Sequence, residues 1–188
     1  MEPSKLSPFQ IRKFTTLFNH YDRSRNGFLT SRDFRAFADR IQKYFGWSDS
    51  DPRTQRVRTN REAAFRRLVA TSDKDFDGKV SLGEYLRFFE RQMVAHEQTG
   101  AATPALLQSC REVLEMLDAD GNGTISAKEY GGMISAMGSD VNAADVFQKL
   151  DRSGQGRLTL LDLERLTLEF VLSQDPDAPG NFLYCGKV

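Results

Sequence analysis

The sequence contains few cysteine, histidine and tryptophan residues. Its 188 residues include only two Cys, two His and one Trp. Two cysteines, Cys110 and Cys185, are too few for a disulfide framework, so we expect both thiols to be reduced. His20 and His96 have no recognisable nucleophile or metal-ligand partner near them in the sequence. These shortages predict that the protein is not an enzyme, and we interpret Cys185 as an ordinary packed or exposed cysteine rather than a reactive thiol.

An excess of charge of one sign and a long apolar run are also missing. The 26 Lys and Arg residues balance 26 Asp and Glu residues, which argues against a nucleic-acid partner bound through overall charge. No run approaches the roughly 18 apolar residues that indicate a membrane span. The start, MEPSKLSPFQ, has neither the apolar run of a signal peptide nor a glycine after Met1 for myristoylation. We therefore expect a cytoplasmic monomer without a nucleic-acid partner and without stable membrane association.

What the sequence does have is an internal repeat. Four segments share an acid at the first position, glycine at the sixth, an aliphatic residue at the eighth, a hydroxyl at the ninth and an acid at the twelfth. They are DRSRNGFLTSRDF from Asp22, DKDFDGKVSLGEY from Asp73, DADGNGTISAKEY from Asp118 and DRSGQGRLTLLDL from Asp151. Apolar residues stand four positions before each segment and at its sixteenth position: Phe18, Val69, Leu114 and Phe147, then Phe37, Phe88, Met133 and Leu166. This helical spacing predicts that each segment joins two amphipathic helices.

Local signals mark helix starts and the pairing of the segments. Ser7-Pro8-Phe9-Gln10 reads as a capping box with proline at the first helical position. Asn142 is placed to cap the short helix before the fourth segment. The eighth positions predict two short antiparallel bridges, Leu29 with Val80 and Ile125 with Leu158.

The four segments resemble the EF-hand calcium-binding loop. In such a loop, oxygen ligands at positions 1, 3, 5, 7, 9 and 12 surround the ion, position 7 acts through its backbone carbonyl, and glycine at position 6 permits a sharp turn. The resemblance implies an all-α fold of four EF-hand helix–loop–helix units, in two pairs that form one compact globule. The loops occupy residues 22–33, 73–84, 118–129 and 151–162.

The spacing of the loops divides the chain into three parts. We expect an amino-terminal pair of hands in residues 1–97, a carboxy-terminal pair in residues 98–172 and a tail in residues 173–188. The predicted linker between the pairs is residues 96–103, HEQTGAAT. The tail contains the apolar cluster Phe182, Leu183 and Tyr184, which is unfavourable to leave in water. We therefore expect the tail to pack on the core, in a cavity between the two halves.

The second and third loops contain every ligand type that calcium requires. The second offers Asp73, Asp75, Asp77, the carbonyl of Lys79, Ser81 and Glu84. The third offers Asp118, Asp120, Asn122, the carbonyl of Thr124, Ser126 and Glu129. Glutamate at the twelfth position can bind with both oxygens, and each loop sums to a charge of −2. Acidic surface turns would not explain two complete loops with matching helices, so we expect both loops to bind Ca²⁺.

The first loop has acceptable but weaker ligands. It offers Asp22, Ser24, Asn26, the carbonyl of Phe28, Thr30 and Asp33. Aspartate at the twelfth position is one methylene shorter than glutamate, which suits a smaller site and therefore Mg²⁺. Three arginines, Arg23, Arg25 and Arg32, give this loop a charge of +1. We expect it to bind more weakly than the second and third loops, or with mixed Ca²⁺ and Mg²⁺ occupancy.

The fourth loop is the poorest. Its candidate ligands are Asp151, Ser153, Gln155, the carbonyl of Arg157, Thr159 and Asp162. Glutamine at the fifth position carries one methylene more than the usual Asp, Asn or Ser, and two arginines cancel the two carboxylates. We interpret this hand as a structural partner for the third, with metal binding at Asp151 as the competing interpretation.

Composition and resemblance together favour a buffer. A calcium sensor exposes an adaptable, methionine-rich groove when it binds the ion, but this sequence has five Met against 14 Phe. Gly131-Gly132 is expected to interrupt the exit helix of the third hand. The unequal loop spacing, the length and the tail resemble the sarcoplasmic calcium-binding proteins and their bacterial relatives of the calerythrin type. This resemblance implies a cytosolic Ca²⁺/Mg²⁺ buffer that binds two to three ions.

Three alternatives compete with this interpretation. The first is a calcium sensor that regulates a protein partner. The second is a hydrophobic small-ligand carrier of the luciferin-binding type; a photoprotein is disfavoured because the chain offers so few His and Trp contacts. The third is an anionic lipid or nucleic acid bound by a run of arginines, although we expect a solvated helix face that balances the acidic loops. The run comprises Arg53, Arg56, Arg58, Arg61, Arg66 and Arg67.

Overall fold

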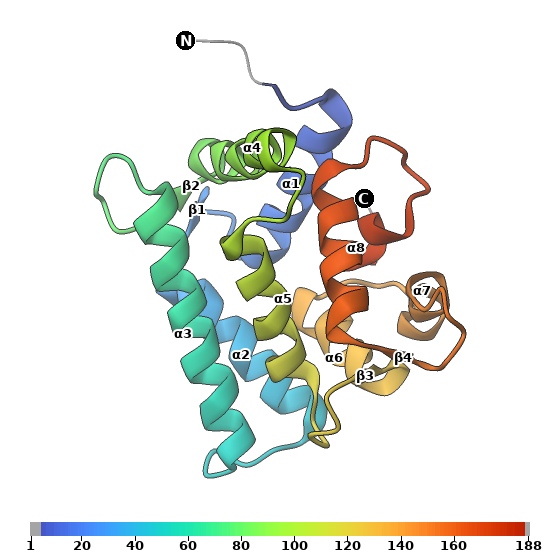
Figure 1. The fold of residues 1–188 in the computed structure, drawn as a ribbon. Helices are drawn as coiled ribbons and strands as arrows, with labels where there is room; N and C mark the ends of the chain where they lie inside the picture. Colours follow the sequence, from blue (N-terminus) through green and yellow to red (C-terminus); the bar gives the residue numbers. More distant parts are fainter. Residues whose placement is uncertain (1–4, 187–188) are drawn as a thin grey trace.

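The computed structural model describes residues 5–186, which form eight α-helices, four two-residue strands and one 3-10 helix. The helices are α1 (Pro8–Tyr21), α2 (Ser31–Phe45), α3 (Pro52–Ser72), α4 (Leu82–Thr99), α5 (Pro104–Leu117), α6 (Ala127–Met137), α7 (Ala143–Leu150) and α8 (Leu160–Leu172). The others are β1 (Phe28–Leu29), β2 (Val80–Ser81), β3 (Ile125–Ser126), β4 (Arg157–Leu158) and η1 (Pro179–Phe182). Consecutive helices flank each predicted loop (Figure 1), so the all-α fold of four helix–loop–helix units is confirmed.

Side-chain hydrogen bonds fix where several helices begin. Ser7 Oγ accepts from Gln10 N at 3.2 Å while Gln10 Oε1 accepts from Ser7 N at 2.9 Å, which confirms the predicted capping box. Asn142 caps α7, because its side-chain oxygen accepts from Ala144 N. Helix α4 continues to Thr99, so only residues 100–103 connect the two pairs, fewer than predicted.

The strands join the loops in pairs. Strand β1 pairs antiparallel with β2 and brings Leu29 opposite Val80, while β3 pairs with β4 and brings Ile125 opposite Leu158. Both bridges were predicted from the eighth positions of the loops. All four aliphatic side chains are buried, so each bridge also anchors its two loops to the core.

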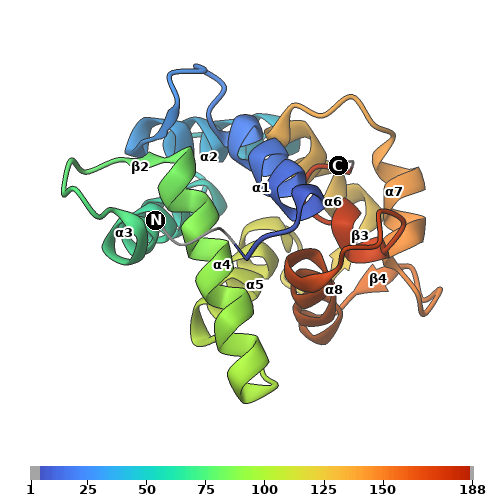
Figure 2. The same ribbon diagram turned by 90° about the horizontal axis from the view of Figure 1, so that it is seen from above.

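The two pairs of hands share one hydrophobic core. Helix α2 packs on α6, α3 on α5 and α4 on α8. Each of these three contacts joins the amino-terminal pair to the carboxy-terminal pair. The ring of Phe14 in α1 stacks on Phe89 in α4 at 4.1 Å and meets the edge of Phe170 in α8 at 5.6 Å. Figure 2 shows helices of both pairs around this core. Across residues 5–186, no helix has the length and apolar character needed to cross a membrane.

The glycine pair of α6 serves the contact between the pairs of hands. Helix α6 runs without interruption through Gly131 and Gly132, so the expected break was wrong. A Cβ atom at Gly131 would overlap the hydroxyl of Tyr44, and one at Gly132 would lie 3.0 Å from the ring of Phe45. Both aromatic residues belong to α2. The glycines therefore allow α2 to approach α6 closely.

The segment after α8 is held against the core. Leu183 and Cys185 are buried, and the Tyr130 hydroxyl lies 2.9 Å from the carbonyl oxygen of Phe182 and 3.0 Å from that of Leu183. Lys13 Nζ donates to Asn181 Oδ1 at 3.1 Å and to a carbonyl at the end of α8. Burial lowers the pKa of Lys13 to about 8, and the charge of Glu169 offsets part of this shift. The described part of the tail, up to residue 186, thus contacts α1, α6 and α8.

Candidate metal sites

The backbone follows the same path in all four loops. In each loop the carboxylate at the first position accepts from the N–H of the glycine at the sixth: Asp22 from Gly27 (2.8 Å), Asp73 from Gly78 (2.9 Å), Asp118 from Gly123 (2.9 Å) and Asp151 from Gly156 (2.6 Å). These glycines have φ angles of +73° to +84°, a region that side chains with a Cβ rarely adopt. The loop conformation therefore depends on the first and sixth positions, which all four segments share.

Loops 2 and 3 each gather three carboxylates. One carboxylate oxygen from each of Asp73, Asp75 and Glu84 lies within 4.8 Å of the others, and Asp118, Asp120 and Glu129 form the same arrangement. Asp77, at the fifth position of loop 2, is not part of its triad. Loops 1 and 4 contain only two carboxylates at ligand positions and form no such triad. The structure thus brings together three of the side chains predicted for each of the two strong loops.

The two glutamates span their loops. Glu84 Oε2 accepts from Ser81 N at 2.9 Å, and its other oxygen accepts from Lys74 N at 2.8 Å on the opposite side of the loop. Glu129 does the same with Ser126 N and Ala119 N, both at 2.8 Å. Both oxygens of each glutamate therefore lie beside the loop interior, an arrangement compatible with bidentate metal coordination.

Hydrogen bonding also favours the charged form of Glu84. Burial acts to raise the pKa of this carboxyl group, but the N–H groups of Lys74 and Ser81 and the Ser81 hydroxyl hold the pKa below its ordinary value. The ionised carboxylate is the form that binds a metal ion. Glu84 is therefore prepared for an ion both in position and in charge.

The closing aspartates of loops 1 and 4, Asp33 and Asp162, accept backbone hydrogen bonds on only one side of their loops. Asp33 Oδ2 accepts from Thr30 N at 2.9 Å, and Asp162 Oδ2 accepts from Thr159 N at 2.9 Å. Neither aspartate accepts from the N–H at the second position. That N–H belongs to Arg23 in loop 1 and to Arg152 in loop 4, and each donates to a carbonyl of the preceding helix instead. The aspartates thus cap α2 and α8 but leave the far side of each loop without their oxygens.

Gln155 is directed away from a ligand role in loop 4. Its Oε1 accepts from Nη2 of Arg157 at 3.2 Å, and its own backbone N–H donates to Asp151 Oδ1 at 3.3 Å. The side chain at the fifth position is therefore engaged with an arginine. The donor set of loop 4 fits a calcium ion less well than those of loops 2 and 3, which offer hard oxygens from at least three carboxylates, a hydroxyl and a carbonyl.

Contacts from α3 to loop 3 were missed by sequence reasoning. Arg56 Nη2 donates to the carbonyl of Asp118 at 3.0 Å, and Arg53 Nη1 donates to that of Ala119 at 3.4 Å. Arg61 is buried and pairs with Glu112 of α5 at 3.5 Å. The predicted solvated face was therefore wrong for Arg61. The clustering of arginines was visible in the sequence, but the partners in these three contacts lie more than 50 residues away and carry no local signal.

Comparison with known proteins agrees with this geometry. A family model described as EF hand matches residues 111–134, which include all of loop 3. Calerythrin of Saccharopolyspora erythraea is 25% identical over 154 residues, which cover 81% of this chain and 86% of calerythrin. Obelin of Obelia geniculata is 27% identical over 180 residues, which cover 93% of this chain and 89% of obelin.

A solved structure shows the same fold. A sarcoplasmic calcium-binding protein from amphioxus superposes with a TM-score of 0.67, over 97% of this chain and all of that chain. Its sequence identity of 23% supports the fold alone. The four loops, the capping pattern and the paired strands agree with these similarities. The chain has the fold of four EF-hands and is similar in sequence to calerythrin.

Proposed function

We propose that the protein is a cytosolic calcium buffer that binds Ca²⁺ at loops 2 and 3 and, more weakly or in exchange with Mg²⁺, at loop 1. The observation that carries this proposal is the position of Glu84 and Glu129. Each has both oxygens beside the loop interior, with an oxygen within 4.8 Å of those of two aspartates. The further ligands of these loops are the oxygens of Asp77, Ser81 and Lys79, and of Asn122, Ser126 and Thr124. Loop 4 acts as the structural partner of loop 3.

The distribution of apolar side chains favours a buffer over a sensor. A sensor needs a hydrophobic groove for its target. The helices of the two pairs instead cover one another, and the large apolar side chains that are exposed among residues 5–186 are scattered over several elements: Ile11, Phe28, Tyr44, Phe76 and Leu161. Apolar residues of both pairs form one core. If the helices of either pair moved apart to expose a groove, the contacts within this core would be lost.

Titration calorimetry tests the metal stoichiometry. We expect two tight calcium sites and a third, weaker site whose heat diminishes when Mg²⁺ is present. Four equal sites, or a single site, would contradict the proposal. The titration needs no partner, and it also tests whether the protein binds calcium as a monomer if its sedimentation is measured in parallel.

A hydrophobic dye distinguishes the buffer from the sensor. For a buffer, dye fluorescence and the radius of gyration change little when calcium is added to the metal-free, folded protein. A sensor would show a large calcium-dependent rise in dye fluorescence. We further propose that the protein has no catalytic activity, since its acidic clusters are accounted for by ion binding.

A further inference from the structure

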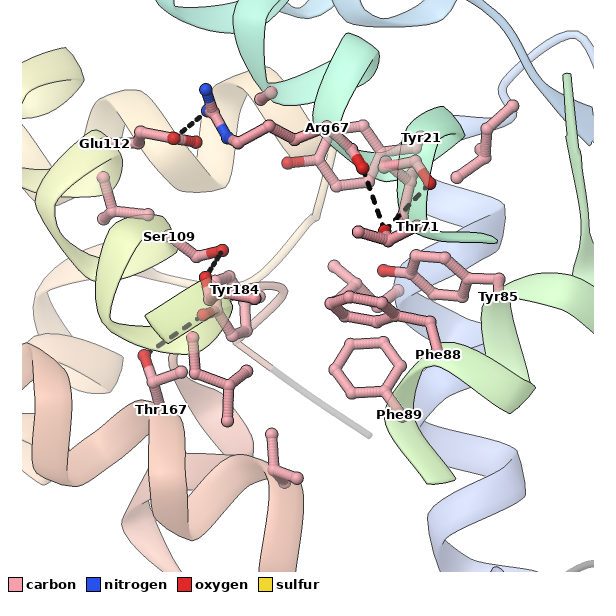
Figure 3. Close-up of a pocket in the computed structure, with 18 of the residues that line it drawn as sticks. Tyr21, Arg67, Thr71, Tyr85, Phe88, Phe89, Ser109, Glu112, Thr167 and Tyr184 are labelled. Carbon is pink, nitrogen blue, oxygen red and sulfur yellow. Dashed lines mark hydrogen bonds and ion pairs between the residues drawn. The ribbon is translucent and has the colours of Figure 1, made fainter. Parts of the chain in front are cut away.

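Phe76 is the most exposed large apolar side chain of residues 5–186. It is 89% exposed and occupies the fourth position of loop 2. Figures 1 and 2 show the segment between α3 and β2, which contains this loop, projecting away from the helices. Aromatic side chains of α4 in the same hand face inward instead: Figure 3 shows Tyr85, Phe88 and Phe89 beside the space between the two pairs of hands. The ring of Phe76 is therefore presented to the surroundings, which is unfavourable in water.

The backbone at Phe76 has a conformation that suits glycine. Its φ angle is +61°, and the fourth positions of loops 3 and 4 are Gly121 (+76°) and Gly154 (+65°). A bulky residue is strained at such an angle, and strain of this kind occurs mainly at functional sites. The N–H of Phe76 donates to Asp73 Oδ1 at 2.7 Å, so the loop fixes the residue in this conformation. Loop 2 thus carries an exposed ring at a position where glycine would remove both the strain and the exposed apolar surface.

The paired loops 1 and 2 also present basic side chains. Strands β1 and β2 join the two loops, and Lys79 Nζ of loop 2 lies 5.2 Å from the ring centre of Phe28 in loop 1. Phe28 is itself 37% exposed. Exposed aromatic and basic side chains together are typical of surfaces that contact anionic lipid. The exposed basic residues of the two loops are Arg23, Arg25, Arg32, Lys74 and Lys79.

The net charge of these paired loops depends on bound metal. They contain five basic and six acidic residues, which give a charge of −1. Each acidic residue is a candidate metal ligand, whereas no basic side chain is. One Ca²⁺ in loop 2 would change the charge of the paired loops to +1, and a second ion in loop 1 would change it to +3. Bound calcium therefore reverses the sign of the charge and favours contact with an anionic surface.

Loops 3 and 4 do not combine these features. Neither contains an aromatic residue, and the side chains at their seventh positions are Thr124 and Arg157. Their charges sum to −2, and one Ca²⁺ in loop 3 would bring the sum only to zero. Among the four loops, the aromatic and basic surface is therefore confined to the amino-terminal pair.

We propose that the paired loops 1 and 2 form a calcium-dependent contact surface for an anionic lipid bilayer. The Phe76 ring enters the boundary between headgroups and acyl chains, and the five basic side chains contact the anionic headgroups. One ring and a small positive charge give a weak, reversible contact, which is compatible with the expected lack of stable membrane association. The calcium dependence rests on the proposed ion binding at loop 2. The loaded protein would collect at an anionic membrane and leave it as calcium falls.

Cosedimentation of the full chain with vesicles tests the proposal. Vesicles of equimolar phosphatidylserine and phosphatidylcholine are expected to bind the protein in calcium and to release it when a chelator is added. Vesicles of phosphatidylcholine alone are expected to bind it much more weakly. Equal binding to the two kinds of vesicle, equal binding with and without calcium, or no binding to the phosphatidylserine vesicles in calcium would overturn the proposal.

Phe76→Gly tests the role of the ring. Glycine suits the positive φ angle, so the fold and calcium binding are expected to persist while vesicle affinity decreases by about tenfold. Leu161→Gln is the matched control, because Leu161 is 52% exposed on the carboxy-terminal pair. It is expected to leave vesicle binding unchanged. Unaltered binding by Phe76→Gly, or an equal decrease in both variants, would overturn the assignment of the ring.

Lys74→Gln tests the role of charge. Removal of this exposed cation is expected to weaken vesicle binding by about fivefold at saturating calcium. Lys128→Gln makes the same change of charge at an exposed position of loop 3 and is expected to have little effect. Equal decreases in the two variants would mean that total charge causes the attraction, and the assignment to loops 1 and 2 would be wrong.

Calcium titration without vesicles separates this proposal from the proposed ion binding. Glu84→Gln is expected to lose the calcium site of loop 2 and, with it, the calcium-dependent binding to vesicles. If calorimetry shows calcium at loop 2 of the unmodified protein and the vesicles still do not retain it, the contact surface is wrong and the buffer role stands. If loop 2 takes up no calcium in this titration, the buffer role itself is contradicted.

Discussion

Loops 2 and 3 end in glutamate and loops 1 and 4 end in aspartate, yet all four have the same backbone conformation. In each loop the first carboxylate accepts from the glycine N–H at the sixth position, and the twelfth carboxylate accepts from the N–H at the ninth. Only the glutamates also reach the N–H at the second position. The comparison teaches that the loop fold and the reach of the closing carboxylate are separable: aspartate is enough for the loop conformation, whereas only glutamate places oxygens on both sides of the loop.

Loss of a closing glutamate is expected to have the largest effect. Glu84→Gln or Glu129→Gln should each weaken calcium binding at its own loop by about 100-fold, since removing a charged, hydrogen-bonded group costs about 3 kcal/mol and each 1.4 kcal/mol is about tenfold. Calorimetry would detect the loss of one tight site. The control is Glu97→Gln, an exposed residue of α4 outside the loops. Retention of both tight sites in either variant would contradict the assignment.

Shortening the side chain without removing its charge is a finer test of the comparison. Glu129→Asp should make loop 3 resemble loop 1 and weaken its calcium binding by about tenfold, because the hydrogen bond to Ala119 N is lost along with bidentate closure. The capping bond to Ser126 N can persist, so the helical content measured by circular dichroism should be unchanged. Unaltered affinity would show that reach is not what separates the loops.

The reverse substitution should improve a weak loop. Asp33→Glu is expected to strengthen calcium binding at loop 1 by about threefold to tenfold and to reduce competition by Mg²⁺, because a longer carboxylate suits the larger ion. Asp162→Glu is its matched counterpart in loop 4, where Gln155 bonds to Arg157 and limits the gain. Equal gains in the two loops, measured by competition titration, would mean that the fifth position is not limiting.

The arginine contact to loop 3 should have the smallest effect. Arg56→Gln removes a hydrogen bond to the carbonyl of Asp118 and is expected to weaken the third loop by about twofold, since an exposed bond of this kind contributes less than 1 kcal/mol. Arg66→Gln, which changes the total charge equally, should leave loop 3 unaltered. A similar decrease of calcium affinity in both variants would indicate a general charge effect. High salt would then abolish the decrease in both.

Much of the fold was predictable because its signals are local. Glycine at the sixth position, aliphatic residues at the eighth and a capping residue at each helix start each act within a few residues, and the helices and both strand pairs followed from them. The difference between Glu84 and Asp33 was also predictable, since it depends on the length of one side chain. How the two pairs face each other depends on contacts between distant segments, which no local pattern specifies.

Gly131 and Arg61 illustrate what was not predictable. A glycine in a helix has a local cost, so the sequence indicated a break in α6, but the space taken by Tyr44 of α2 gives the glycine a packing role. Arg61 belongs to a charged run that resembles a surface, and its burial follows from Glu112 in a different pair of hands. In both cases the deciding partner is far away in the sequence.

The two strand bridges have a consequence for how the protein would fill with ions. Each bridge joins one loop closed by glutamate to one closed by aspartate, β1 to β2 and β3 to β4. Two glutamate-closed loops in the same pair could load together in one steep step, but here each pair has a single loop closed by glutamate. Uptake would then rise gradually with the calcium concentration instead of switching at a threshold. A graded response of this kind suits a reservoir better than a signal.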